Sequence, residues 1–246
     1  MFVGVALRGH PLLGFFMSKT SRKIRTLLPA LILLFLASHA SPAQPKEDYL
    51  TWTRQQATHI GRKWRMAGRV GWQFVRWDPP QYSGVCFYEL RGTLMSPEAL
   101  RATARLEQLR RRLTDDETRA LVTEAEKIDG LVVFIELNPR EGSGVIPLDW
   151  QATLRPKGVK DDSPLAIGGT STPSLREVKA LTRVGPRDYA YDVFWMVFPM
   201  RDKQGKQIWE TPPDEIELVV EINNMRGRVS WRVSDSLRQR LLTSTD

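Results

Sequence analysis

The chain has 246 residues, 41% of them hydrophobic, which is enough to bury one large core or two small ones. Its net charge is +8, but residues 1–43 carry five basic residues and no acidic one, and the rest holds 31 basic and 28 acidic residues. A surface that binds duplex nucleic acid is normally much more one-sided, so we expect no nucleic-acid partner.

Residues 1–43 have the order of a secretory signal peptide. A basic stretch from Lys19 to Arg25 precedes an apolar run from Leu27 to Ala37, and two small-residue cleavage sites follow before residue 44. Met17 stands at the natural start of such a signal, so the residues before it are interpreted as upstream sequence. The apolar run is about half of the roughly 20 residues that a membrane-spanning helix needs, which favours cleavage over anchoring. We therefore expect an exported protein, periplasmic or extracellular, that meets the membrane only during export.

Residues 44–140 are predicted to form an α+β region. Weak helical spacing up to Gly61 is followed by two strand-like stretches, Val70–Trp77 and Val85–Leu90, which the turn residues between them join into a hairpin. Ser96 and Thr114 then carry helix-start signals, the second with the spacing of a capping box. Another apolar strand, residues 131–137, ends the region.

Residues 141–246 are predicted to be mostly β. Val193–Phe198 consists of six large apolar residues with no polar face, so we interpret it as a central strand covered on both faces. Glu215–Ile222 alternates, and a hairpin turn leads from it to Val229–Val233. We expect these three strands to form an antiparallel meander covered by a second sheet, a β-sandwich that is Ig-like in general architecture.

Smaller features complete the second half. Residues 145–154 read as an extended segment whose Pro147 suggests an edge position. Residues 156–173 have loop composition, and the tail from Ser234 favours a final helical turn or two. Pattern alone leaves open whether residues 44–140 and 141–246 are two domains or share one continuous sheet.

The scarcity of histidine and cysteine limits the chemistry. His59 is the one histidine after residue 43, and Cys86 is the one cysteine, so a metal centre built on several imidazoles or thiolates is excluded and no cofactor is expected. A Cys–His nucleophile pair would have to use these two residues. Cys86 is better explained as a small strand residue in the core, and His59 as a solvated residue near a helix end.

Carboxylates offer the strongest enzyme hypothesis. Glu136, Glu141 and Asp149 lie near the expected central strands, and a pair of carboxylates can hydrolyse a glycosidic bond without histidine. Charged residues beside turns are usually solvated, however, so we favour a protein without catalytic activity.

Tryptophans and arginines interleave between residues 62 and 77. Planar aromatic rings can stack on sugars or partner side chains, while guanidinium groups bind anions. The competing explanation is that the tryptophans pack into the core and the arginines flank them, as in many aromatic-rich strands. The candidate ligand-binding residues are Trp64, Trp72, Trp77, Arg62, Arg65 and Arg76.

These observations lead to one main hypothesis and two alternatives. We expect an exported, non-catalytic protein that binds a protein or a glycan in the bacterial envelope or the extracellular space. The first alternative is a carboxylate-dependent glycan hydrolase. The second is a periplasmic assembly or chaperone-like factor that offers a sheet edge to a partner strand.

Overall fold

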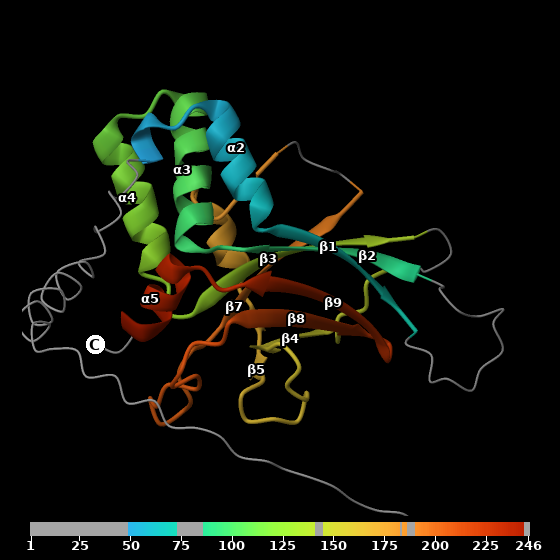
Figure 1. The fold of residues 1–246 in the computed structure, drawn as a ribbon. Helices are drawn as coiled ribbons and strands as arrows, with labels where there is room; N and C mark the ends of the chain where they lie inside the picture. Colours follow the sequence, from blue (N-terminus) through green and yellow to red (C-terminus); the bar gives the residue numbers. More distant parts are fainter. Residues whose placement is uncertain (1–48, 73–85, 141–144, 183, 186–189, 244–246) are drawn as a thin grey trace, which may run out of the picture. The chain divides into compact units, whose positions relative to one another are not determined.

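The computed structural model describes residues 49–72, 86–140, 145–182, 184–185 and 190–243 (Figure 1). The expected signal segment and its cleavage sites lie outside these residues. Within the described ranges, no helix is long and apolar enough to cross a membrane.

Helices and strands follow one another in groups along the described chain, and most of the α-helices lie in its first half. The helical elements are the 3₁₀ turns η2 (Tyr49–Thr51) and η4 (Pro173–Glu177) and the α-helices α2 (Arg54–Lys63), α3 (Pro97–Arg111), α4 (Asp115–Glu126) and α5 (Asp235–Thr243). The strands are β1 (Arg65–Gly71), β2 (Cys86–Leu94), β3 (Leu131–Pro139), β4 (Gln151–Pro156), β5 (Ile167–Gly168), β6 (Thr170–Ser171), β7 (Asp192–Phe198), β8 (Glu215–Ile222) and β9 (Met225–Arg232).

All nine strands belong to one antiparallel sheet, in the order β5-β4-β8-β9-β1-β2-β3-β7-β6. The mixed α+β class is confirmed, but the Ig-like sandwich is not, because one sheet stands in place of two stacked ones. Strands β1 to β3 lie between strands that come from the second half of the chain. The sheet is therefore continuous across residue 140.

The two ends of this strand order meet, so that the sheet curls almost into a barrel. β5 pairs with β4 and β6 pairs with β7, and only Gly169 separates the two short strands. The Gly169 amide donates to the Ala152 carbonyl at 2.8 Å. A β-carbon at Gly169 would lie 2.7 Å from the Phe198 ring, so this close passage needs glycine. Across the seam, the rings of Trp150 and Phe194 meet edge to face with centroids 4.8 Å apart.

The inner face of the sheet carries the main hydrophobic core. Buried residues alternate along β8 and β9 with the period of two that a strand imposes. Trp231 packs against Gly92, where a β-carbon would lie 3.1 Å from the indole ring. Its indole nitrogen donates to the Trp64 carbonyl at 2.7 Å, so the buried donor is satisfied. The interior is therefore filled by the side chains of the sheet itself.

Helices cover part of the outer face and one end of the sheet (Figure 1). Leu100, Ala104 and Val122 from α3 and α4 form a second core with Val132 and Phe134 on the outer side of β3. Two buried leucines of α5 belong to the inner core. The apolar sequence of β7 predicted cover on both faces, and this holds for its second half, where Met196 and Phe198 are buried and Val197 is half-buried; Asp192 and Val193 at its start are exposed.

Local sequence explains where the helices begin. Thr53 and Thr114 form capping boxes with Gln56 and Glu117, three positions on. The Ser96 hydroxyl caps α3. The two helices predicted from Ser96 and Thr114 are therefore confirmed, and a short helix, α2, overlaps the stretch in which weak helical spacing was noted.

The strand pairing is partly as predicted. The pairing of the two strands before Ser96 is confirmed as β1 with β2, but β1 overlaps the predicted strand Val70–Trp77 only at residues 70 and 71, and residues 73–77 lie outside the described ranges. The β8–β9 hairpin is confirmed, with Asn223 and Asn224 both at positive φ, as a tight two-residue turn requires. The meander prediction is wrong at its first step, because β7 lies between β3 and β6 rather than beside β8. The edge prediction for β4 is also wrong, since β4 pairs with β8 and, over a short length, with β5.

The chemistry of the outer faces explains this pairing. Trp195 of β7 packs edge to face against Phe134 of β3, with ring centroids 5.0 Å apart. The outward residues of β4, β8 and β9 are instead mostly charged, and several form cross-strand ion pairs. An apolar outer face needs a helical cover, and a charged one does not.

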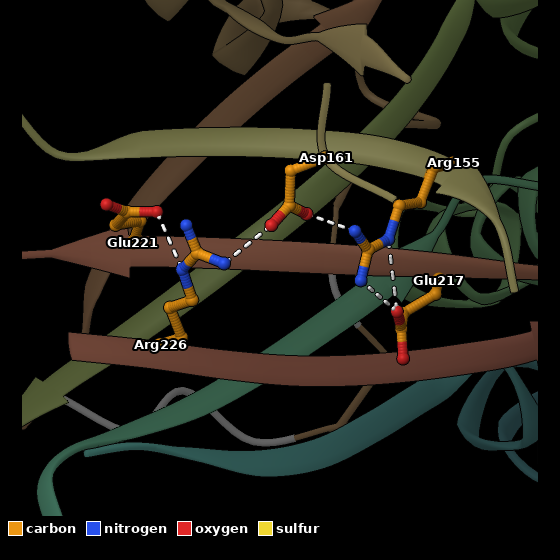
Figure 2. Close-up of polar contacts among 5 residues, drawn as sticks. All are labelled: Arg155, Asp161, Glu217, Glu221 and Arg226. Carbon is orange, nitrogen blue, oxygen red and sulfur yellow. Dashed lines mark hydrogen bonds and ion pairs between the residues drawn. The ribbon is translucent and has the colours of Figure 1, made fainter. Parts of the chain in front are cut away.

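Five charged side chains form a continuous row of ion pairs on the outward side of β4, β8 and β9 (Figure 2). Arg155 donates to Glu217 at 2.8 Å and also to Asp161. Arg226 donates to the other oxygen of Asp161 at 2.5 Å and to Glu221 at 2.9 Å. Because Asp161 lies in the loop after β4, this row ties the loop to the sheet.

Candidate functional site

The predicted ligand-binding residues that the structure describes do not form one surface. Trp64 is buried in the inner core just before β1, whereas Trp72 is half exposed just after β1 ends. Eight steps of nearly extended chain separate them, about 25 Å at about 3.3 Å per residue. The two rings therefore cannot stack on one small ligand. Trp77 and Arg76 lie outside the described residues.

The two remaining predicted residues have different surroundings. Arg62 is exposed in the last turn of α2. Arg65 faces the outer side of the sheet, where its Nε and Nη2 donate to the two carboxylate oxygens of Glu136 at 2.8 and 2.9 Å. The Glu136 side chain is 0% exposed. Arg65 thus neutralises a charge that burial alone would make very unfavourable.

The burial of Glu136 and its pairing with Arg65 argue against Glu136 as a catalytic carboxylate of a glycan hydrolase. A general acid or base must reach the substrate, and Glu136 is buried and held by a guanidinium group. Asp149 is exposed in the turn before β4, and Glu141 lies outside the described residues. Among the described side chains, no group of three or more potential ligands is placed to hold a metal ion.

The possible Cys–His pair is also separated. His59 is exposed on α2, which leads into the first residue of β1. Cys86 is paired with Gly71, the last residue of β1. The length of β1, about 20 Å at about 3.3 Å per residue, lies between them, so they cannot act as a nucleophile and its base.

A second polar group continues along the outer face beside Glu136. The Tyr191 hydroxyl donates to Glu89, and Arg140 pairs with the same carboxylate at 3.4 Å. The Arg91 guanidinium lies 4.0 Å from the centroid of the Tyr191 ring. The hydrogen bond from Tyr191 lowers the pKa of Glu89, and the charge of Arg140 acts in the same direction. These contacts fix the side chains at this end of β2, β3 and β7.

A groove of about 680 Å³ lies between α2, α3 and the outer face of β3 and β7. Phe134, Val193 and Trp195 line it from the sheet, and Thr58 and Leu106 line it from the helices. It is larger than the pocket beside α5, of about 560 Å³, and the pocket over the loop after β4, of about 620 Å³. A concave site with an aromatic floor and a few polar groups is the usual form of a ligand site.

Charged groups stand at the rim of the groove. Glu107 accepts from Arg110 at 2.7 and 2.9 Å, and Arg111 lies 3.4 Å from the same carboxylate. Burial would raise the pKa of Glu107, but these two arginines lower it below its usual value. Arg54 also lines the groove and has no ion pair among the described residues. The rim therefore carries more positive than negative charge.

Sequence reasoning missed this groove for a physical reason. Its lining comes from four helices and strands and from the segment before β7, which are distant in the chain, and each shows only its own packing pattern in the sequence. The apolar run of β7 correctly indicated burial of Met196 and Phe198 but not the exposure of Val193, 36%, which depends on where its neighbouring strands end.

Comparisons with known proteins add no assignment. No protein-family model and no curated protein matches this chain. One solved structure, a protein of unknown function from Burkholderia pseudomallei, is 12% identical over 64% of this chain and 80% of its own. Its TM-score is 0.32, a likeness too weak to support an argument about fold or function.

Proposed function

We propose that the protein is an exported, non-catalytic binding protein that holds a partner protein in the groove between α2, α3 and β7. The groove carries the proposal, because an aromatic floor with arginines at the rim is typical of protein recognition sites. Export rests on the order of basic, apolar and small residues in 1–43. The filled interior of the sheet leaves the outer surface as the place for a ligand.

A protein partner suits the groove better than a glycan. Sugar rings stack on open aromatic faces, whereas Trp195 is half-buried and packs edge to face against Phe134. The indole nitrogen of Trp195 already donates to the Leu181 carbonyl at 2.8 Å. The floor thus offers apolar contact area more than hydrogen bonds to sugar hydroxyls.

An assembly or chaperone-like role is the second candidate. The strand registers place the ends of β1 and β3 and the starts of β4 and β7 at one end of the sheet. Large apolar side chains are exposed at that end: Trp72, Val145, Leu148 and Val193. Exposed apolar residues in such number favour contact with another protein.

Photo-crosslinking from the groove tests the proposal. A benzoylphenylalanine in place of Thr58, which lines the groove, is expected to give one discrete adduct in envelope preparations. The matched control carries the same group in place of His59, which is exposed on the same helix and does not line the groove. Arg54→Glu should remove the adduct from the Thr58 position. The same set of adducts from both positions would contradict the proposal.

Export has a separate test. N-terminal sequencing of the protein recovered from the envelope or the medium is expected to begin after residue 40 or residue 43. Recovery of a chain that retains the basic stretch from Lys19 to Arg25 would contradict cleavage.

A further inference from the structure

The backbone of β7 has one side that is only partly paired. In an antiparallel sheet, successive residues direct their N–H and C=O groups to opposite neighbours. The Arg140 amide donates to Phe87 and the Met95 amide to Val132, so even-numbered residues of β3 bond to β2 and odd-numbered ones to β7. It follows that the odd-numbered residues of β7 direct their backbone groups away from β3, toward β6.

β6 ends before it reaches the start of β7. Its two residues lie opposite Met196 and Val197, and the Thr172 amide then donates to the Trp195 carbonyl at 2.8 Å. The chain turns into η4 at Pro173. Among the described residues, no backbone group bonds the N–H or C=O of Val193 on this side. An open strand edge therefore begins at Val193, whose exposure is 36%.

This edge borders the groove. Val193 and Trp195 both line the groove, so a strand added beside them would direct alternate side chains to the same face of the sheet as these two residues, at the edge of the groove. The segment before β4 lies across the same seam, because the Trp150 ring contacts Phe194, and Leu148 on that segment is fully exposed. Backbone pairing and an apolar pocket for alternate side chains are the two parts of recognition by strand addition.

The charge of the rim indicates which strand would bind. Arg54 occupies the first turn of α2, where the helix dipole disfavours a cation, so positive potential concentrates at that helix end. Arg110 adds a second guanidinium to the rim, opposed by Glu107. Asp192 is exposed at the start of β7, but the alternation of the strand directs it to the other face. Acidic side chains on the incoming strand would therefore meet the arginines.

We propose that the ligand is an extended acidic peptide segment of a partner protein, which adds as a strand to β7 at Val193 and places apolar side chains in the groove. This inference rests on the proposed function and specifies the chemistry of the partner. Strand addition explains why the edge is open beside an apolar groove, two features that a rigid surface contact would not need together.

Binding of a defined peptide pool tests the proposal. The probe is a fluorescent pool of peptides of about ten residues, with Val, Leu, Ile or Phe at odd positions and Asp or Glu at even ones. One control pool has Lys at the even positions, and a second has alternate backbone nitrogens methylated, which removes pairing donors. We expect the acidic pool to bind the mature chain about tenfold more tightly than either control, and less tightly in about 0.5 M salt.

Two pairs of variants locate the binding. Val193→Pro removes an outward N–H without touching the ladder to β3 and should weaken binding about tenfold, whereas Val193→Ala keeps that donor and should weaken it less than about threefold. Arg54→Glu should weaken binding about fivefold, whereas Lys203→Glu, an exposed charge reversal in the loop after β7, should not. Should Val193→Pro fail to fold, the methylated pool answers the same question from the peptide.

Equal binding of the acidic and lysine pools, or no loss on backbone methylation, would overturn strand addition. The crosslink from Thr58 shows whether strand addition alone fails or the groove proposal fails with it. If the Thr58 crosslink persists while the pools fail, the partner binds the groove by another mode. If the crosslink is absent as well, both proposals fail.

Discussion

Two parts of the outer face of the sheet stabilise buried charge in different ways: the part that helices cover, and the charged part formed by β4, β8 and β9. On the part of the outer face formed by β1, β2, β3 and β7, Glu136 is fully buried and Arg65 donates to both of its carboxylate oxygens. Under the loop after β4, the Arg155 side chain is 5% exposed, and Asp161 links it to Arg226 nearer the surface (Figure 2). A fully buried charge such as Glu136 needs a direct ion partner. A charge that is not fully buried, such as Arg155, can instead pair with carboxylates that are themselves partly hydrated.

The two parts of the outer face also differ in whether their charged side chains are already paired. The pocket over the loop after β4 is lined mainly by charged side chains that already pair with one another, among them Arg155, Asp161 and Glu217. The groove on the helix-covered face has an aromatic floor, an open strand edge and Arg54 without an ion partner among the described residues. We therefore propose that a partner binds at the helix-covered part of the outer face, whereas the charged part attaches the loop after β4.

Removing Arg65 should have the largest effect on stability. Arg65→Met leaves the Glu136 carboxylate buried without its guanidinium, and we expect the free energy of unfolding to fall by about 3–5 kcal/mol. Urea denaturation of the variant and of the double variant Arg65→Met/Glu136→Leu measures this. The double variant should recover most of the loss, since it removes the buried charge. A double variant as unstable as the single one would contradict the account.

Removing Arg155 should cost less, although its side chain is also buried. Glu217 and Asp161 are 12% and 38% exposed, so both carboxylates can be hydrated once Arg155 is replaced. We expect Arg155→Met to lower the free energy of unfolding by about 2–3 kcal/mol, and the loop 157–162 to become more sensitive to protease. A loss larger than that of Arg65→Met would reverse the comparison.

Gly168 and Gly169, where β5 leads into β6 and the sheet closes, form a matched pair for substitution. A β-carbon at Gly169 would lie 2.7 Å from the Phe198 ring, whereas one at Gly168 would meet nothing within 4 Å. We expect Gly169→Ala to lower the free energy of unfolding by about 1–3 kcal/mol through overpacking, and Gly168→Ala to change it by less than about 0.5 kcal/mol. Equal effects at the two positions would contradict the closure of the sheet at Gly169.

The smallest expected effect depends on pH. The Tyr191 hydrogen bond lowers the pKa of Glu89 in the folded chain, so this contribution to stability is fully present above the unfolded pKa of about 4.5 and is lost progressively as the pH falls from there through the lowered folded pKa. Tyr191→Phe should therefore lower the urea midpoint slightly at about pH 6 and by less at about pH 3. A difference that is the same at both values would show that Glu89 is not the group involved.

Much of the local structure could be predicted because its causes are local. The caps at Ser96 and Thr114, the hairpin turn at Asn223 and the burial of the second half of β7 all follow from residues within a few positions of one another. The pairing partners of β4 and β7 could not be predicted, because they depend on whether outward side chains are charged or apolar on strands far apart in the chain.

The candidate site also depends on residues that are far apart in the chain. Glu136 and Arg65 are 71 positions apart, and Tyr191 and Glu89 are 102 apart, so no spacing in the sequence could indicate either contact. The predicted tryptophans had the composition of a binding surface, yet Trp64 is in the core. Trp72 remains an exposed candidate at the end of the sheet where β1 ends and β7 begins.

Amide hydrogen exchange, resolved by residue with NMR, tests the open edge most directly. In the free protein the Val193 amide, directed away from β3, should exchange rapidly, and the Phe194 amide, paired with β3, should be protected. Adding the acidic peptide pool should protect Val193 and leave Phe194 unchanged. A Val193 amide that is already protected in the free protein, or that the peptides leave unprotected, would contradict the account.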